Sequence, residues 1–276
     1  MKLIFLDADG TLFHHDGYIP ESALKAISKA QENGHKVFLC TGRQLPELYG
    51  DLLKPSYDGL ITGSGAHVEI NKETVLELQF SKEQIISLTN YFVENDIDAI
   101  YEGSEGVYVN SKTKEHIKRL ADEQCKGLSE EELQKSGIYN IVLYTTLSDN
   151  LNDHATNKIS FLESKLTYDE IYNHLNDQFD VVPCTFAPFG KQSGEISCPN
   201  ITKGHGIQII KKHYKSDTKD IIAIGDNFND LPMFEVSGIS VAMGNAPEGV
   251  KEKADYITDS LENDGIYKAF KHFELI

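Results

Sequence analysis

The stretch LIFLDADGTLF, residues 3–13, places an apolar run directly before two aspartates. The run has the length and the continuous apolar character of a strand that is buried on both faces. Asp7 and Asp9 follow at its end, with Gly10 and Thr11 after them. Two carboxylates this close together raise each other's pKa, unless a cation neutralises them. The stretch therefore predicts a buried strand that ends in a site for a cation.

The same pattern of a short apolar strand and a helix recurs at both ends of the chain. Strands are predicted at 3–7, 36–43, 58–65, 220–226, 239–243 and 255–258, and helices at 20–34, 44–53, 203–214 and 230–237. Short apolar strands that alternate with helices are typical of a parallel sheet covered on both faces. The two ends therefore predict one α/β core with a Rossmann-like parallel sheet, and a last helix after residue 258.

The middle of the chain is more polar and alternates more, which predicts an inserted domain. Helices are predicted at 82–95 and 168–175, strands at 99–103, 107–110, 139–145 and 179–184, and a return linker at 187–194. This mixture suits an α+β cap whose sheet has one solvated face. We therefore predict a catalytic core of residues 1–81 and 193–276, and an inserted cap of residues 82–192.

The composition limits the kinds of partner. The chain of 276 residues has 26 Lys and Arg against 43 Asp and Glu, a net charge of −17. Such an acidic chain repels nucleic-acid backbones and anionic membrane surfaces, so neither is expected as a partner. Its four cysteines lie far apart, without a metal-ligand or redox spacing, and are expected to be idle thiols. The N-terminal apolar run breaks too early for a signal peptide and no stretch could span a membrane, which predicts a cytoplasmic protein.

Residues with useful chemistry follow several predicted strands or begin a helix. In a parallel α/β sheet, ligands bind beyond the carboxyl ends of the strands. The residues in such places are Asp7, Asp9, Thr41, Gly42, Lys203, Asp226 and Asp230. Converging carboxylates are hard oxygen ligands, which favour Mg²⁺ held together with water and substrate phosphate. A hydroxyl, a glycine amide and an ammonium can then bind the oxygens of a phosphoryl group.

Four motifs carry a resemblance to a known family. DADGT (7–11), TGR (41–43), the lysine of TKG (202–204) and GDNFND (225–230) resemble, in this order, the four motifs of the haloacid dehalogenase-like hydrolases. The insert resembles, in position and length, the large α/β cap of the Cof-type (class IIB) phosphatases. GSGAHV (63–68) and VAMGNAPEGVKEKADYIT (241–258) are also similar to that subgroup.

The resemblance implies a role for each matching residue. Asp7 is similar to the nucleophile that forms an aspartyl-phosphate, and Asp9 to the acid that protonates the leaving alcohol and then activates water. Mg²⁺ would be bound by a carboxylate oxygen of Asp7, the backbone carbonyl of Asp9 and the carboxylate of Asp226. The other implied roles are phosphate binding for Thr41, Gly42 and Lys203, substrate binding for Asn229, and support of the metal shell and of Lys203 for Asp230. The cap would close over the site and choose the substrate.

Other conspicuous residues are given structural roles. His14 and His15 are adjacent, and adjacent side chains on a strand point in opposite directions, so a partly exposed loop is favoured over a metal site. Arg43 is expected to pair with a nearby acid. SEEEL, residues 129–133, predicts the start of a capped helix. The aromatic residues expected to pack in the sheet of the insert are Tyr101, Tyr108, Tyr139, Tyr144 and Phe161.

These features predict a Mg²⁺-dependent phosphatase that acts on small phosphorylated metabolites, sugar phosphates first, through a phosphoaspartate on Asp7. A phosphosugar mutase of the same superfamily would use almost the same core and is an alternative. A regulatory module that binds metal and phosphate without turnover is a second alternative, which the intact pair Asp7 and Asp9 disfavours.

Overall fold

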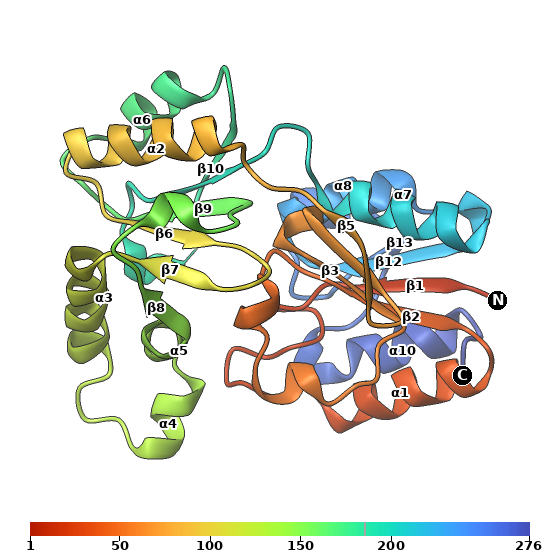
Figure 1. Cartoon of the computed structure of the whole chain (residues 1–276). Helices are drawn as coiled ribbons and strands as arrows, with labels where there is room; N and C mark the ends of the chain where they lie inside the picture. The colour runs from red at the N-terminus through yellow and green to blue at the C-terminus, as the bar shows by residue number, and fades with distance from the viewer. Residues whose placement is uncertain (185) are drawn as a thin grey trace. The chain divides into compact units, whose positions relative to one another are not determined.

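The computed structural model describes residues 1–184 and 186–276, which form two compact units (Figure 1). Unit 1 comprises Met1–Arg43, Leu48–Glu77 and Thr202–Ile276, and unit 2 comprises Gln44–Glu47 and Leu78–Ile201. The chain leaves unit 1 after residue 77, where the sequence places the core boundary at 81, and it returns after residue 201 instead of 192. Gln44–Glu47, which the sequence places in the core, also groups with unit 2.

Unit 1 is built on a sheet with the strand order β14-β13-β12-β1-β2-β3-β4-β5. Its strands are β1 (Leu3–Leu6), β2 (Lys36–Cys40), β3 (Gly59–Thr62), β4 (His67–Ile70), β5 (Glu73–Glu77), β12 (Ile221–Gly225), β13 (Ile239–Ala242) and β14 (Tyr256–Ile257). From β14 to β3 neighbouring strands run parallel, as predicted for the core. Every residue of β1 is fully buried, which fits a strand covered on both faces.

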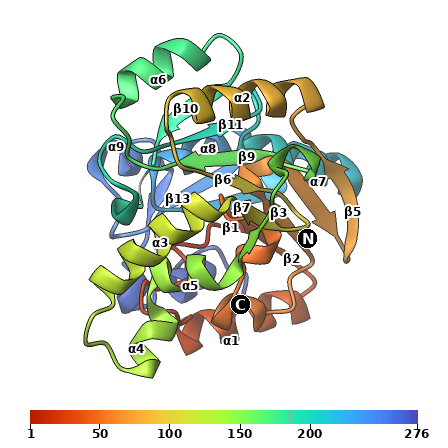
Figure 2. The same ribbon diagram turned by 60° about the vertical axis from the view of Figure 1, so that its left-hand side comes forward.

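Helices cover both faces of this sheet (Figures 1 and 2). They are α1 (Glu21–Glu32), α7 (Lys203–Tyr214), α8 (Leu231–Val236), α9 (Glu248–Lys251) and α10 (Gly265–His272). α1 and α10 pack together on one face, and α7 and α8 pack together on the other. Burial of apolar side chains from these helices against the strands supplies the main favourable free energy of folding for this unit.

The structure departs from the sequence prediction in two segments. A hairpin of β4 and β5, for which no element was predicted, extends the sheet in antiparallel fashion. Its two turn residues, Asn71 and Lys72, have φ of 51° and 69°. Glycine is the residue that usually marks such a left-handed turn in a sequence, and neither residue here is glycine. The helix predicted at 44–53 is two short 3₁₀ turns, Leu45–Glu47 and Gly50–Leu53, because Gly50, with φ of 58°, interrupts it.

Unit 2 has a sheet of its own, with the strand order β10-β11-β9-β6-β7-β8. Its strands are β6 (Ala99–Glu102), β7 (Val107–Val109), β8 (Thr145–Leu147), β9 (Lys158–Phe161), β10 (Asp180–Pro183) and β11 (Gly194–Ser197). Its helices are α2 (Lys82–Glu94), α3 (Ser111–Gln124), α4 (Glu130–Lys135), α5 (Gly137–Tyr144) and α6 (Tyr168–Leu175). α2 and α6 cover one face of the sheet, and α3 and α5 cover the other (Figures 1 and 2).

The strand predicted at 139–145 was wrong, because most of this segment is helix α5. Its buried residues Ile138 and Ile141 are three positions apart, which is helical spacing that the run of apolar residues around them obscures. Tyr139 and Tyr144 therefore lie on a helix and not on a strand. Tyr144 still packs against the core that this helix forms with the sheet. Tyr101, Tyr108 and Phe161 do lie on strands of the sheet.

Two further predictions for unit 2 have opposite outcomes. The return linker predicted at 187–194 was wrong, because Gly194 already begins strand β11. The helix start predicted at 129–133 is confirmed by α4. The hydroxyl of Ser129 accepts a hydrogen bond from the amide of Glu132, whose carboxylate accepts one from the amide of Ser129.

Gln44 is anchored inside unit 2 although it directly follows Arg43 of unit 1. Its side chain is fully buried and donates a hydrogen bond to Oδ1 of Asn157 at 2.7 Å. Its backbone amide donates to the carboxylate of Glu47, also at 2.7 Å. Two consecutive residues therefore belong to different units.

All four cysteines are free; Cys40 is buried and the other three are partly buried. Among residues 1–184 and 186–276, no helix combines the length and the apolar character that crossing a membrane requires.

Candidate active site

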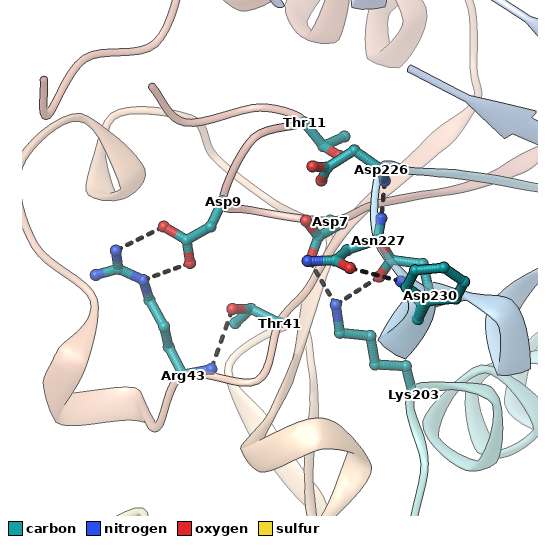
Figure 3. A network of polar contacts seen from close by, with 10 residues as sticks. Asp7, Asp9, Thr11, Thr41, Arg43, Lys203, Asp226, Asn227 and Asp230 are labelled. Carbon is teal, nitrogen blue, oxygen red and sulfur yellow. Dashed lines mark hydrogen bonds and ion pairs between the residues drawn. The ribbon is translucent and has the colours of Figure 1, made fainter. Parts of the chain in front are cut away.

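The predicted site residues of unit 1 follow neighbouring strands of its sheet (Figure 3). β1 pairs in parallel with both β2 and β12, so the carboxyl ends of the three strands lie at one edge of the sheet. Asp7 follows β1, and its amide donates to the carbonyl of Ile224 in β12 at 3.0 Å. Thr41 follows β2 and Asp226 follows β12. The parallel register therefore brings residues from both ends of the chain together.

Lys203, the first residue of α7, links two of the carboxylates. Its Nζ donates to Oδ1 of Asp7 at 2.5 Å and to Oδ1 of Asp230 at 2.6 Å. All three residues are at least nine-tenths buried. Thr202 supports this arrangement, because its hydroxyl accepts a hydrogen bond from the amide of His205 and caps α7.

The charges of this group act on one another strongly because water is excluded. Burial raises the pKa of Asp7 well above its usual value, and Asp230 raises it further, while Lys203 opposes both effects. Burial alone would lower the pKa of Lys203, but Asp230 and Asp7 hold it above the ordinary value. The charged form of Lys203 is therefore favoured, whereas burial and Asp230 disfavour the charged form of Asp7.

Asp226 is held beside Asp7 by a hydroxyl and an amide. Thr11 Oγ1 donates to Oδ1 of Asp226 at 2.8 Å, and Asn245 Nδ2 lies 3.4 Å from its Oδ2. Burial raises the pKa of Asp226 to about 6, Thr11 opposes the shift, and Asp230 adds to it. Asp230 accepts hydrogen bonds from the backbone amides of Asp226 and Asn227 at 2.9 and 3.0 Å, which fixes the loop that carries Asp226.

The carboxylates form a donor set that suits a divalent cation. One oxygen each from Asp7, Asp226 and Asp230 lie within 4.8 Å of one another. Three carboxylates against one ammonium leave an excess of negative charge, and hard oxygen donors select Mg²⁺ or Ca²⁺. A Cβ on Gly10 would lie 2.5 Å from Oδ2 of Asp226, so only glycine leaves this side of the carboxylate open. The residues present therefore fit the predicted ion.

Asp9 points away from this cluster and toward Arg43 (Figure 3). Arg43 donates to its carboxylate twice, from Nε to Oδ2 at 2.9 Å and from a terminal nitrogen to Oδ1 at 2.7 Å. The acid that the sequence pairs with Arg43 is therefore Asp9 itself. More than half of the Asp9 side chain is exposed, whereas Asp7 is buried.

The predicted phosphate-binding residues lie at the end of β2. Thr41 is buried, and its hydroxyl accepts a hydrogen bond from the amide of Arg43 at 3.1 Å, which leaves its own proton available to a ligand. Gly42 lies against Ser64, because a Cβ on Gly42 would be 3.3 Å from the Ser64 hydroxyl oxygen. Asn229 lies exposed on the 3₁₀ turn Phe228–Asp230, and no hydrogen bond of its side chain is found within the described chain.

Two residues beside the site were not predicted as part of it. Asn245 donates to the carbonyl of Gly10 at 2.9 Å and accepts from the amide of Leu261, so it ties the loop after β13 to the loop after β1. Ser64 adopts a left-handed conformation with φ of 56°, which is unusual for a residue other than glycine. Asn245 comes two residues after the predicted strand 239–243, so the rule that ligands bind beyond strand ends could have pointed to it. Ser64 falls inside the strand predicted at 58–65, so the same rule could not have found it.

His14 and His15 lie in a loop, as predicted, but the geometric argument for them was wrong. Their rings do not point in opposite directions: the ring centroids are 3.9 Å apart. His14 is buried and stacks on Tyr18, while His15 is exposed. The two rings and Asp16 could offer atoms to one ion, but the amide of Asp16 already donates to Nδ1 of His14 at 3.1 Å.

Comparisons with known proteins identify the family. The model of the haloacid dehalogenase-like hydrolases matches residues 4–270. The chain belongs to this family. It is 27% identical to the 5-amino-6-(5-phospho-D-ribitylamino)uracil phosphatase YcsE of Bacillus subtilis (strain 168), over 100% of this chain and 96% of that one. It is 24% identical to a phosphoglycolate phosphatase of Thermoplasma volcanium, over 100% of both chains.

Solved structures extend the match to the fold of the haloacid dehalogenase-like hydrolases. The chain is similar to the subclass IIB sugar phosphatase BT4131, with a TM-score of 0.77, 25% identity and complete coverage of both chains. This subclass is the Cof-type group that the sequence resembles. The relatives are named phosphatases, so the chain is a haloacid dehalogenase-like enzyme of the phosphoric monoester hydrolase class.

Proposed function

We propose that this enzyme hydrolyses small phosphorylated metabolites, with sugar phosphates as the leading class, through a phosphoaspartate on Asp7 and with Mg²⁺ as cofactor. The observation that carries the proposal is the buried arrangement of Asp7, Lys203 and Asp230 beside Asp226. A buried carboxylate against a fixed ammonium is suited to attack a group that carries negative charge, because Lys203 can neutralise that group.

Mg²⁺ would be held by Asp7 and Asp226, with Asp230 behind them and the backbone carbonyl of Asp9 as a further oxygen donor. When bound, it supplies positive charge that keeps these carboxylates ionised and draws electron density from the phosphoryl oxygens. The raised pKa values of Asp7 and Asp226 support this assignment, because nearby positive charge favours the ionised form of both carboxylates.

In the first step, an oxygen of Asp7 attacks phosphorus and the bond from phosphorus to the substrate oxygen breaks. Asp9, in its protonated form, gives its proton to the departing alkoxide. Thr41, the amide of Gly42 and Lys203 bind the phosphoryl oxygens while charge builds on them. The products of this step are a free alcohol and a phosphorylated Asp7.

In the second step, Asp9 is a carboxylate and takes a proton from a water molecule. The oxygen of that water attacks phosphorus, and the bond from phosphorus to Asp7 breaks. Inorganic phosphate leaves, Asp7 is a carboxylate again, and Asp9 carries the proton for the next cycle. Half-exposure of the Asp9 side chain supports this role, because both the alcohol and the water must reach it.

We assign the chemistry to unit 1 and the choice of substrate to unit 2. All the predicted catalytic and metal-binding residues lie in unit 1. The names of the relatives support a small phosphate ester as substrate: BT4131 is called a sugar phosphatase, and YcsE acts on a phosphorylated ribityl compound. Asn229, exposed beside Asp230, is proposed to bind substrate.

The test is a panel of phosphorylated metabolites with Mg²⁺, scored by the release of inorganic phosphate and by kcat/KM. We expect release from several sugar phosphates. Conversion of a sugar phosphate to an isomer without phosphate release would instead indicate a phosphosugar mutase. Failure to turn over any member of the panel, together with p-nitrophenyl phosphate, would contradict the proposal and favour a binding module.

A further inference from the structure

Arg43 and Asp9 form a bidentate ion pair. Arg43 uses two nitrogens on the two oxygens of one carboxylate, at 2.9 and 2.7 Å. Such paired hydrogen bonds fix the plane of the carboxylate as well as its distance, which a single lysine contact cannot do. Arginine is rare in this chain, since Arg119 is the only other one among 276 residues.

The guanidinium of Arg43 is itself held by aromatic rings. It lies 5.4 Å from the ring centre of Phe13 and 4.9 Å from that of Tyr49. The two rings contact each other edge to face, with centres 5.8 Å apart. Phe13 belongs to the same turn as Asp9, because its carbonyl accepts a hydrogen bond from the amide of Gly10 at 3.0 Å. The turn that carries Asp9 therefore also contributes Phe13 to the aromatic contacts of Arg43.

The backbone of Arg43 is fixed as firmly as its side chain. Its amide donates to the hydroxyl of Thr41 at 3.1 Å, and its carbonyl accepts from the amide of Gly63 at 2.8 Å. An exposed ion pair contributes little to stability, because water competes for both charges and the long side chains lose freedom. The Arg43 side chain is only 21% exposed, and its other contacts already restrict its conformations. Pairing with Asp9 therefore costs it little additional conformational entropy.

We propose that Arg43 is a positioning residue that sets the orientation of the Asp9 carboxylate for proton transfer. The inference rests on the proposed function, in which Asp9 serves as acid and base. Asp9 itself stands on a half-exposed turn, where a free carboxylate would take several rotamers. Arg43 restricts it to one plane and to a direction away from Asp7 and the metal-binding carboxylates. The leaving oxygen lies on that side when Asp7 attacks in line. The step that depends most on this restriction is proton donation from Asp9 to the leaving oxygen.

A pair of aryl phosphates whose leaving groups differ in basicity separates this role from others. p-Nitrophenyl phosphate releases a stable anion that needs little proton donation, whereas phenyl phosphate releases a more basic oxygen that needs more. The value of kcat/KM covers all steps up to departure of the phenol, so it reports the acid step and excludes the later attack by water. The variants are Arg43→Gln and Arg43→Lys, with Arg119→Gln as a matched control, because Arg119 is exposed on α3.

We expect Arg43→Gln to lower kcat/KM for phenyl phosphate by about tenfold or more, and for p-nitrophenyl phosphate by less than about threefold. Arg43→Lys should recover part of the loss, since it keeps the charge and loses the paired geometry. Arg119→Gln should match the unchanged enzyme with both substrates.

Three results would overturn the proposal. Equal losses with both substrates would mean that Arg43 binds phosphate or supports the fold. No loss with either would mean that the pair has no role in the reaction. A larger loss with p-nitrophenyl phosphate would contradict the acid role assigned to the pair. Failure of the unchanged enzyme to hydrolyse either ester would instead contradict the proposed function, so the two failures are distinguishable.

Discussion

Asp7 must be a carboxylate anion to act as the nucleophile of the proposed reaction. Asp7→Asn keeps the size of the side chain and removes the nucleophilic oxygen that the proposed function requires. We expect turnover to fall by about 1,000-fold or more, because an amide is a much weaker nucleophile than the carboxylate it replaces. The measurement is phosphate release from the best substrate of the panel.

The control for this change is Asp217→Asn, an exposed aspartate that pairs with Lys219 at the surface of unit 1. It removes the same charge elsewhere and should leave the rate unchanged. A rate for Asp7→Asn close to that of the control would refute the covalent route. Thermal unfolding of both variants checks that they fold.

Asp226 is the residue whose loss should act mainly through the metal. We expect chelation to stop the reaction and Mg²⁺ to restore it. In Asp226→Asn, the Mg²⁺ concentration for half-maximal activity should rise by about tenfold or more, because an amide oxygen is a weaker donor than a carboxylate. The titration can be repeated by calorimetry with Mg²⁺ alone, which separates binding from turnover. Full activity in chelator would show that the metal assignment is mistaken.

At the scale of single residues, position along a strand was the useful signal. Asp7, Thr41 and Asp226 could be proposed from sequence because each directly follows a recognisable apolar strand. The position of Asn245 near the site could have been inferred in the same way. Its contacts to Gly10 and Leu261 could not, because those residues are distant from it in sequence. The rings of His14 and His15 lie together because the loop turns there, which a rule for extended strands does not describe.

The position of helix α7 depends on a glycine outside it. Gly65 has φ of 106°, and a Cβ there would lie 2.1 Å from the carbonyl oxygen of Thr202, immediately before Lys203. Gly65→Ala should therefore displace the start of α7. We expect a loss of stability of about 1 kcal/mol from the backbone conformation and typically about 1–3 kcal/mol more from the clash. Activity should fall as well, because Lys203 moves.

Gly34→Ala is the matched control for this element. Gly34 also has positive φ, 85°, but a Cβ there would meet nothing within 4 Å. It should lose about 1 kcal/mol of stability and keep its activity. Denaturant unfolding and phosphate release, measured on both variants, separate strain from displacement. Equal effects of the two substitutions on kcat would contradict the inference that Gly65 positions the start of α7.

At the scale of elements, clear amphipathic or fully apolar patterns could be predicted, and mixed ones could not. Helix α6 has the predicted bounds because Ile171 and Leu175, four residues apart, face the core and Thr167 caps its start. The segment of α5 is apolar on most sides, so its residue types favour a strand while its packing makes it a helix. The turn of the β4–β5 hairpin lacks the glycine that would have marked it.

The stability of the molecule should depend on acid through His35. Burial, the N-terminal amino group and Lys2 lower the pKa of His35, and the amide of Lys2 donates to its Nδ1 at 3.0 Å. The folded chain thus prefers neutral His35, and the unfolded chain takes up the proton first as the pH falls. The contribution is present above the unfolded pKa of about 6.5 and is lost as the pH falls below it.

We therefore expect the melting temperature to drop between pH 7.5 and pH 5.5, and to drop less in His35→Gln. His213→Gln serves as a comparison, because His213 is an exposed histidine near the end of α7. An identical pH dependence in wild type and His35→Gln would contradict the linkage.

At the scale of the whole chain, alternation of strand and helix was enough to predict the parallel core, because both faces of such a sheet must be apolar. It was not enough to place Gln44–Glu47, whose residues group with unit 2 through contacts such as the hydrogen bond from Gln44 to Asn157. A contact between residues 113 positions apart leaves no local trace in sequence.

The junction between Arg43 and Gln44 has an evolutionary consequence. Arg43 binds the carboxylate of Asp9, which we propose as the proton donor, and Gln44 is buried in the unit to which we assign substrate recognition. Mutations at positions 44–47 that are selected for a new metabolite would also alter the torsion angles next to Arg43. Substrate preference and catalytic rate would then change together in evolution. Homologues that have acquired a new substrate should also differ in how strongly their catalytic rate depends on the basicity of the leaving group.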